Sequence, residues 1–401
     1  MLTILHSNVA RIDSGVLTVD RKFHLGMQRY VEAIASPILT VHPEHDGETE
    51  IMDPVTVSFN EIGYRVMTLK TNRLGGPAAT ETNRLRDQIS KSELAYFCGG
   101  FLDPKLARSL GVPYVLAIEC DLRTQIVISK SEVSSVFRRA ARTARCSVRY
   151  AKTGIPAMRG AHSLHCNGYP VFDESRWFNA NRLLYLDSRM TANLVVTEAQ
   201  LNSRFASQGR RSARLLFSGR YEPLKGAVDV VRVAVECIRR GVDVELHCYG
   251  QGSLKAEMTR IAATAGLLGT QIRIHDAIPF DELTKVAHTF DLFVCCHVQG
   301  DPSCTYLETL GAGLPIVGYG NSMWKRLCQE SKSGFWSPVG DVIAVAADIQ
   351  KLTSDWTQLR TMSENARRFA LAHTFDCEFS RRTDSINEAL NSLRSSRLAT
   401  Q

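Results

Sequence analysis

The residues best suited to chemistry lie in a short loop of the second half of the chain, Ser218-Gly-Arg-Tyr-Glu-Pro-Leu-Lys-Gly226. Arg220 is a fork-shaped donor and Lys225 is a point charge, a combination that suits two neighbouring phosphates. The loop follows an apolar run and precedes a helix-like segment, so we expect it at the carboxyl end of a parallel sheet, where open α/β folds bind ligands. Two isolated loop cations are usually solvated, and the prediction therefore depends on the loops that follow.

A second loop, Cys248-Tyr-Gly-Gln-Gly-Ser253, again follows an apolar run and leads into a helix-like segment. Gly250 and Gly252 would let the backbone approach a ligand closely. We therefore expect both glycines at the same ligand as Arg220 and Lys225.

The third segment, Val298 to Pro315, contains the most informative residues. Ser303 is predicted to be the N-cap of a short helix that ends near Gly313. The backbone N–H groups of Cys304 and Thr305 would then lie at the positive end of the helix dipole, which favours a phosphate. Glu308, one turn further, can accept hydrogen bonds from vicinal hydroxyls such as those of a ribose. Together with the two cations, this predicts a diphosphate site that needs no metal.

The elements that position these loops alternate in a regular way. In the second half, apolar runs that favour strands occur at 214–218, 244–249, 271–275, 292–298 and 315–319, separated by amphipathic helical segments. This alternation predicts βαβ units and a parallel sheet. The first half shows less regular candidate strands at 2–6, 38–41, 65–69, 94–98, 114–119 and 163–166, which indicate a second α/β domain.

In order and spacing, five segments resemble the donor domain of family 4 glycosyltransferases of the GT-B fold. They are 215–220, 225–226, 249–252, 272–283 and 306–317, and the resemblance covers about residues 213 to 345. It implies an α/β protein with two Rossmann-like domains facing a cleft. It also implies transfer of a sugar with retention of anomeric configuration.

The resemblance assigns roles to single residues. It implies that Arg220 and Lys225 bind the diphosphate of a nucleotide and that Glu308 binds the ribose. The first acid of the family's paired-acid motif would fall at residue 300, where this chain has Gly300. Asp301 lies one place beyond it, and whether this carboxylate reaches the sugar hydroxyls stays open, as does the identity of the sugar.

The first half resembles the family's acceptor domain more faintly. Gly26, in Phe23-His-Leu-Gly-Met27, corresponds to a loop that family members place near the donor phosphate and the acceptor. Glu119 stands where many members have a catalytic-site histidine, with Asp121 two residues further. A carboxylate there could orient an acceptor hydroxyl or stabilise positive charge on the donor sugar, and the alternative is a solvated acid at a strand end.

Length and composition suggest two domains. The chain has 401 residues, and its polar stretch 207–213 has the composition of a connection between domains. We expect an acceptor-side domain at 1–209, a nucleotide-sugar domain at 210–375, and a tail at 376–401 that packs back on the first domain.

The net charge of +7 comes from one segment. Residues 122–160 hold nine Lys and Arg and one acid, so the rest of the chain is close to neutral. As a helix, the stretch 133–152 would carry an Arg stripe beside apolar side chains. Anionic lipid, an acidic glycan and plain solvation all stay open, whereas nucleic acid is disfavoured because aromatic side chains for base stacking are sparse there.

The eleven cysteines contain no CxxC pair, which favours a reducing compartment. The start of the chain has no pattern of a secretory signal, and no long apolar window predicts a membrane span. We therefore expect a cytoplasmic protein, with peripheral contact to the inner face of the membrane through 133–152 as one option. Cys295-Cys-His297 is not expected to bind metal, because consecutive strand residues point to opposite faces.

The function that we predict is transfer of a sugar from a nucleoside diphosphate sugar to a saccharide or lipid-linked acceptor. No bound cofactor is expected, since the nucleotide sugar is a co-substrate. Two alternatives remain. One is a catalytically weakened protein that binds nucleotide sugar, and the other is a sugar-nucleotide epimerase or phosphorylase with a similar fold.

Overall fold

The computed structural model describes residues 1–47, 49, 51, 53–72, 76–99, 103–131, 133, 135–206 and 212–399. The chain divides into two compact units. Unit 1 comprises Met1–Leu122, Ala144–Tyr185 and Asp376–Gln401, and unit 2 comprises Arg123–Thr143 and Leu186–Phe375. The domain boundary predicted near residue 210 falls at 207–211, outside the described residues.

Unit 1 is built on a seven-stranded sheet in the order β10-β9-β8-β7-β1-β4-β6. All neighbouring strands in it are parallel. The strands are β1 (Leu2–His6), β4 (Ile38–Pro43), β6 (Arg65–Leu69), β7 (Leu94–Cys98), β8 (Tyr114–Ile118), β9 (Ser163–Asn167) and β10 (Arg182–Tyr185). A small antiparallel sheet joins β2 (Arg11–Asp13), β3 (Val16–Asp20) and β5 (Pro54–Ser58).

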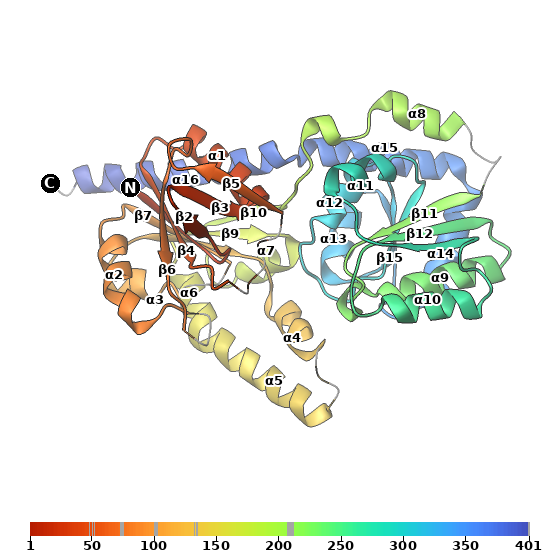
Figure 1. Ribbon diagram of the computed structural model, residues 1–401, viewed down its shortest axis with the longest axis horizontal. Helices are drawn as coiled ribbons and strands as arrows, with labels where there is room; N and C mark the ends of the chain where they lie inside the picture. The colour runs from red at the N-terminus through yellow and green to blue at the C-terminus, as the bar shows by residue number, and fades with distance from the viewer. Residues whose placement is uncertain are drawn as a thin grey trace. The chain divides into compact units, whose positions relative to one another are not determined.

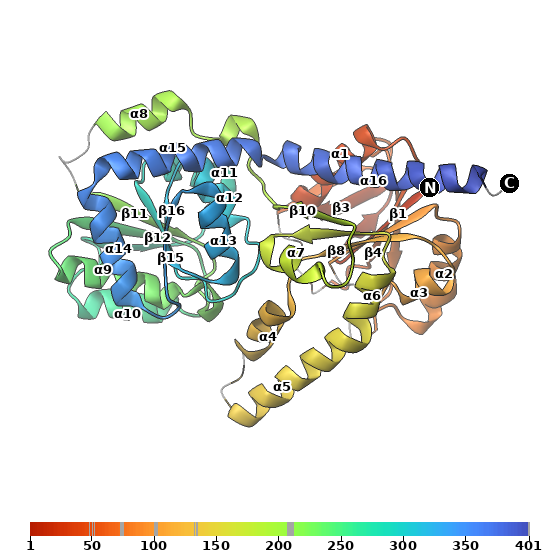
Figure 2. The same ribbon diagram turned by 180° about the vertical axis from the view of Figure 1, so that it is seen from behind.

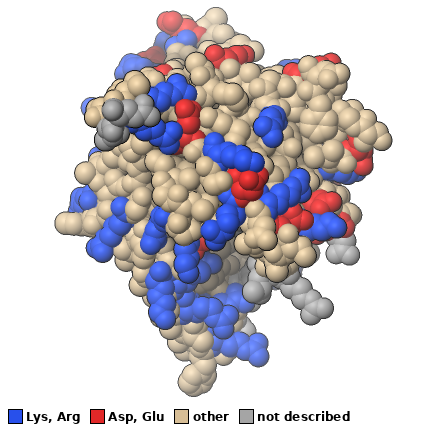
Figure 3. Space-filling model, turned by 90° about the vertical axis from the view of Figure 1, so that its left-hand side faces the viewer, with Lys and Arg blue, Asp and Glu red and all other residues tan. Residues whose placement is uncertain are grey.

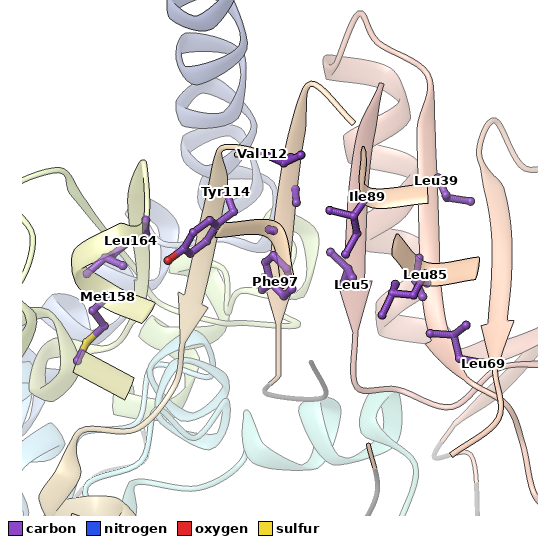
Figure 4. Packing of buried hydrophobic residues seen from close by; sticks show 14 of the residues in the cluster. Leu5, Leu39, Leu69, Leu85, Ile89, Phe97, Val112, Tyr114, Met158 and Leu164 are labelled. Atoms are coloured by element: carbon purple, nitrogen blue, oxygen red, sulfur yellow. The ribbon is translucent and has the colours of Figure 1, made fainter. Parts of the chain in front are cut away.

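The helices of this unit follow its strands along the chain (Figure 1). They are α1 (Arg21–Ala33), α2 (Thr82–Ser90), α3 (Lys105–Ser109), α6 (Ile155–Gly160), α7 (Tyr169–Ser175) and α16 (Phe375–Leu398). Figure 4 shows Leu5 from β1 beside Leu85 and Ile89 from α2, with Phe97 from β7 next along the sheet. The apolar runs predicted as strands thus bury one side of the sheet under helices.

Unit 2 is built on a six-stranded parallel sheet in the order β13-β12-β11-β14-β15-β16. The strands are β11 (Ala213–Ser218), β12 (Val244–Tyr249), β13 (Ile272–His275), β14 (Leu292–Cys295), β15 (Ile316–Tyr319) and β16 (Gly334–Ser337). Counted along the chain, this order is 3-2-1-4-5-6, the Rossmann order, whose strand order reverses beside β11.

Helices cover both faces of this second sheet (Figures 1 and 2). One group is α9 (Ala227–Arg239), α10 (Lys255–Thr264) and α14 (Val342–Ser354), and a second group, α8 (Glu198–Ala206), α12 (Thr305–Gly311) and α13 (Ser322–Ser331), contacts α15 (Trp356–Ala372). The unit also contains α11 (Phe280–Ala287). In α9, Val230, Val231 and Val233 are fully buried, as its amphipathic pattern predicts.

The basic stretch forms two helices, and each lies where the chain passes from one unit to the other. α4 covers Leu122–Ser131 and α5 covers Val136–Arg149, followed by one π-helical turn at Tyr150–Gly154.

No helix in the described part of the chain is long and apolar enough to cross a membrane. All eleven cysteines are free thiols, and most of them are buried.

Candidate functional site

The loop after β11 is held in one conformation by close packing. Tyr221 is fully buried, and its hydroxyl donates a hydrogen bond to the backbone oxygen of His275 at 2.7 Å. Gly226 has φ +60°, and a Cβ on it would lie 2.0 Å from the backbone oxygen of Cys296. Only glycine fits this position, so the short turn Pro223–Lys225 and the Lys225 side chain are fixed in place.

Lys225 is buried beside an acid. Its side chain is 8% exposed, and its ammonium group forms an ion pair with Asp301 Oδ2 at 3.1 Å. The other carboxylate oxygen, Asp301 Oδ1, is buried and has no hydrogen-bond partner among the described residues. Asp301, the acid next to Gly300, therefore balances the charge of Lys225 through Oδ2, and its Oδ1 accepts no hydrogen bond from the described residues.

His297 extends this polar cluster. It is fully buried, and neither ring nitrogen has a hydrogen-bond partner in the described structure. Burial lowers the pKa of His297 well below its ordinary value, and the positive charges of Lys225 and Arg220 lower it further. The imidazole is therefore neutral at neutral pH, and both predicted cations lie within electrostatic reach of one side chain. Gln299 is also buried, with an unpartnered Oε1.

Glu308 lies on α12 and is nearly buried. Its side chain is 12% exposed, and Oε1 accepts a hydrogen bond from Arg189 Nε at 2.8 Å. The Arg189 guanidinium lies over the Phe280 ring at 4.2 Å, which fixes its direction. Arg189 was not predicted, because a partner more than a hundred residues away along the chain leaves no local pattern.

The start of α12 differs from the prediction. The helix begins at Thr305 with Cys304 at the N-cap position, so Ser303 is not the N-cap. The Ser303 hydroxyl instead donates to Thr305 Oγ1 at 3.1 Å. Residues 301–303 form no helix or turn, and the Ser303 backbone N–H donates to the Asp301 backbone oxygen at 2.9 Å.

Gly250 and Gly252 allow the loop after β12 to pack closely against the loop after β11. A Cβ on Gly250 would lie 1.9 Å from the backbone oxygen of Gly219, and one on Gly252 would lie 2.6 Å from that of Tyr221. Glu222 joins the same loops by accepting hydrogen bonds from the Ser253 N–H at 2.9 Å and its hydroxyl at 2.8 Å. Contact of Gly250 and Gly252 with a ligand stays a prediction.

The acceptor-side residues lie in unit 1. Gly26 is inside α1 and not in a loop, and a Cβ on it would lie 2.6 Å from the Phe379 ring, so it serves the packing of α16. Glu119 follows β8, and Asp121 is 9% exposed.

An acid that the sequence reasoning missed lies near Asp121. Glu174 accepts a hydrogen bond from Leu122 N at 2.9 Å and another from the Tyr150 hydroxyl. Burial raises the pKa of Glu174, and the charge of Asp121 acts in the same direction. The end of β8 thus holds a polar group of acids within unit 1, whose catalytic role stays a prediction. Among the described residues, no group of three or more His, Cys, Asp or Glu side chains is placed to hold a metal ion.

Part of the second half of the chain is similar in sequence to a known protein family, and nearly the whole chain is similar in fold to solved structures. Residues 202–369 match the family model described as glycosyl transferases group 1. No curated protein sequence matches the chain. Among solved structures, WaaG, a glycosyltransferase involved in lipopolysaccharide biosynthesis, is 11% identical with a TM-score of 0.60, covering 96% of this chain and 99% of that one.

Two further structures share the fold over the whole chain. Sucrose-phosphate synthase from Thermosynechococcus elongatus is 14% identical with a TM-score of 0.63, covering 100% of both chains. Anabaena HepE in complex with UDP is 14% identical with a TM-score of 0.62, covering 98% of this chain and 99% of that one. At such identities these likenesses show the fold alone.

Two Rossmann-like units, one of them carrying the loop cations and Glu308, define the GT-B fold, which confirms the predicted fold class. The family model that residues 202–369 match is the one whose members the loop motifs of this chain resemble.

Proposed function

We propose that the protein transfers a sugar from a nucleoside diphosphate sugar to a saccharide or lipid-linked acceptor. The observation that carries the proposal is the buried polar cluster of unit 2, where Lys225 pairs with Asp301 at 3.1 Å and the charges of Lys225 and of the exposed Arg220 both lower the pKa of His297. Glu308 lies in the same unit and is oriented by Arg189, which supports its role at a ribose. The match to the group 1 glycosyltransferase model covers all of these residues except Arg189.

The chemistry follows from where charge develops. The bond between the anomeric carbon and the β-phosphate oxygen breaks, the acceptor oxygen bonds to that carbon, and the acceptor proton passes to the departing diphosphate. Negative charge grows on the diphosphate as this happens, and cations fixed beside it stabilise the transition state more than the bound donor. The family resemblance implies attack on the face that the diphosphate leaves, with retention of configuration and without metal.

A thermal-shift screen followed by a transfer assay tests the proposal. The screen uses UDP, GDP, ADP and their sugars, because a ligand that binds only the native state raises the melting temperature. UDP comes first, since HepE is described in complex with it. We expect one nucleotide to stabilise the protein and its sugar to release nucleotide only when a saccharide or lipid-linked acceptor is added.

A nucleotide-binding protein without transfer is the second candidate, and Gly300 favours it. A Cβ at this position would lie 2.0 Å from Ser322 Oγ, so the Ser322 hydroxyl takes the space beside the backbone where the family has an acid. Binding of a nucleotide sugar without turnover across a panel of acceptors would favour this candidate. Product formed without any second saccharide would instead favour an epimerase or phosphorylase.

A further inference from the structure

Helix α5 has two chemically different sides. Arg138, Arg142, Arg145 and Arg149 recur at spacings of three and four residues and therefore lie along one side of the helix. The apolar residues lie together on another side, and they are Val136, Phe137, Ala140, Ala144 and Val148. We call these five residues the apolar face of α5.

The apolar face of α5 is exposed to solvent. Phe137 is 88% exposed, Val136 is 77% exposed and Val148 is 51% exposed. The buried residue of the helix is Cys146, which is not on this face. In α9 the comparable side chains Val230, Val231 and Val233 are fully buried, as is usual for a helix of a globular protein. An exposed apolar face beside an Arg stripe is typical of a helix that binds another surface.

The charge around this face has one sign. Residues 136–154 contain six Lys and Arg and no acid. Figure 3 shows Lys and Arg side chains gathered at the lower end of the molecule, where Figure 1 places α5. The Arg142 guanidinium donates to the backbone oxygen of Ser129 at 2.7 Å, which ties the helix to α4 on the side away from the apolar face. The surface therefore complements an anionic partner.

We propose that α5 docks on an anionic lipid bilayer, with the apolar face of α5 in the interface and its arginines at the lipid headgroups. A bilayer matches both sides of the helix, because it takes up apolar side chains and attracts cations. An acidic glycan would match the arginines alone and would leave Phe137 and Val136 in water. This inference goes beyond the proposed function and does not require glycosyl transfer.

Vesicle flotation with the full-length protein tests the proposal. The probes are vesicles of phosphatidylcholine alone and vesicles in which part of the lipid is phosphatidylglycerol. We expect binding to the anionic vesicles that weakens as salt is added, because headgroup attraction is screened. Phe137→Asp should lower the partition coefficient about tenfold or more, since a charge replaces the most exposed apolar side chain of the helix. The double variant Arg138→Gln/Arg145→Gln should lower it about tenfold or more.

Two matched variants separate the proposal from its alternatives. Arg138→Lys/Arg145→Lys keeps the charge and should retain binding. Ile343→Asp changes a residue of α14 that is 59% exposed and should also retain binding. Circular dichroism and the melting temperature confirm that each variant is folded. Equal binding to neutral and anionic vesicles would overturn the proposal. So would binding that Phe137→Asp leaves unchanged, and capture by a sulfated polysaccharide in place of vesicles would indicate a glycan surface.

Discussion

At the scale of single residues, Asp301 and a bound diphosphate would compete for the same ammonium group. Lys225 is almost fully buried, and without nucleotide its charge is balanced by Asp301. A buried ion pair stabilises little in itself, but removal of one partner leaves an uncompensated charge. The pair therefore keeps a cation in a buried site until an anionic ligand arrives.

Asp301→Asn should tighten the binding of a nucleoside diphosphate and lower the stability of the free protein. Loss of a carboxylate beside the diphosphate removes repulsion of about 1 kcal/mol or more, so we expect about a fivefold gain in affinity by calorimetry. The melting temperature without nucleotide should fall, because Lys225 loses its counter-ion. Asp276→Asn breaks the exposed Lys255–Asp276 pair of the same unit and should change neither value. Weaker binding of the bare nucleotide by Asp301→Asn would show that Asp301 contacts the ligand.

At the scale of elements, the turn between β11 and α9 decides where Lys225 lies. Gly226→Ala should cost more than about 2 kcal/mol in the free energy of unfolding, because a strained φ and a backbone clash add together. It should also weaken nucleotide binding by displacing Lys225. Gly241→Ala is the matched control, since its φ is +75° but no atom lies within 4 Å of the added Cβ. We expect it to cost about 1 kcal/mol and to leave binding unchanged. Equal effects in denaturant titrations of the two variants would contradict the role of the Gly226 contact.

The sequence predicts these elements well where apolar runs are continuous. The strands at Leu2–His6 and Val244–Tyr249 were predicted at their exact bounds, because apolar side chains fill most of their buried positions. The strands Arg11–Asp13 and Pro54–Ser58, at the two edges of the small sheet, were missed, since neither has a buried apolar run. The helix of Glu308 was predicted, but its first residue was not, because helix starts depend on turns that few residues specify.

The candidate site was predicted only where a loop motif contains it. Arg220 and Lys225 follow a strand in a recognisable pattern, whereas Arg189 meets Glu308 only through the fold. His297 was considered as a metal ligand alone, and its position beside Lys225 depends on how β14 continues into the following loop. Contacts between residues far apart in the chain depend on how the elements pack, so they cannot be predicted from the spacing of residues in the sequence.

At the scale of the whole molecule, the C-terminal helix completes unit 1 through one half-buried cation. Arg382 donates to the Tyr96 hydroxyl at 3.2 Å and lies over the rings of Tyr185 and Phe379 at 4.6 Å each. His165 joins the same network through the Tyr96 hydroxyl at 3.1 Å and also contacts Ser385 of α16, and burial together with Arg382 lowers its pKa to about 3. Side chains from α16 thus form part of the core of unit 1.

Arg382→Ala should loosen unit 1 and leave unit 2 unchanged. Loss of desolvated contacts between a cation and aromatic rings should cost about 2 kcal/mol or more, so amide hydrogen exchange should quicken in β7, β9 and β10. Exchange around Lys225 should stay as in the wild type. Arg86→Ala, at an exposed residue of α2 in the same unit, should have little effect. Unchanged exchange in β9 of the Arg382 variant would contradict this role of α16.

The central claim is that Arg220 and Lys225 together bind a nucleoside diphosphate, and calorimetric titration tests it most directly. Each nucleotide that stabilises the protein is titrated into the wild type, Arg220→Ala, Lys225→Ala and the control Lys255→Ala. A charge-assisted hydrogen bond contributes about 1.5–3 kcal/mol, so each of the first two changes should weaken binding about 10- to 100-fold. Lys255→Ala should bind as the wild type does. Wild-type affinity in both Arg220→Ala and Lys225→Ala would contradict the claim.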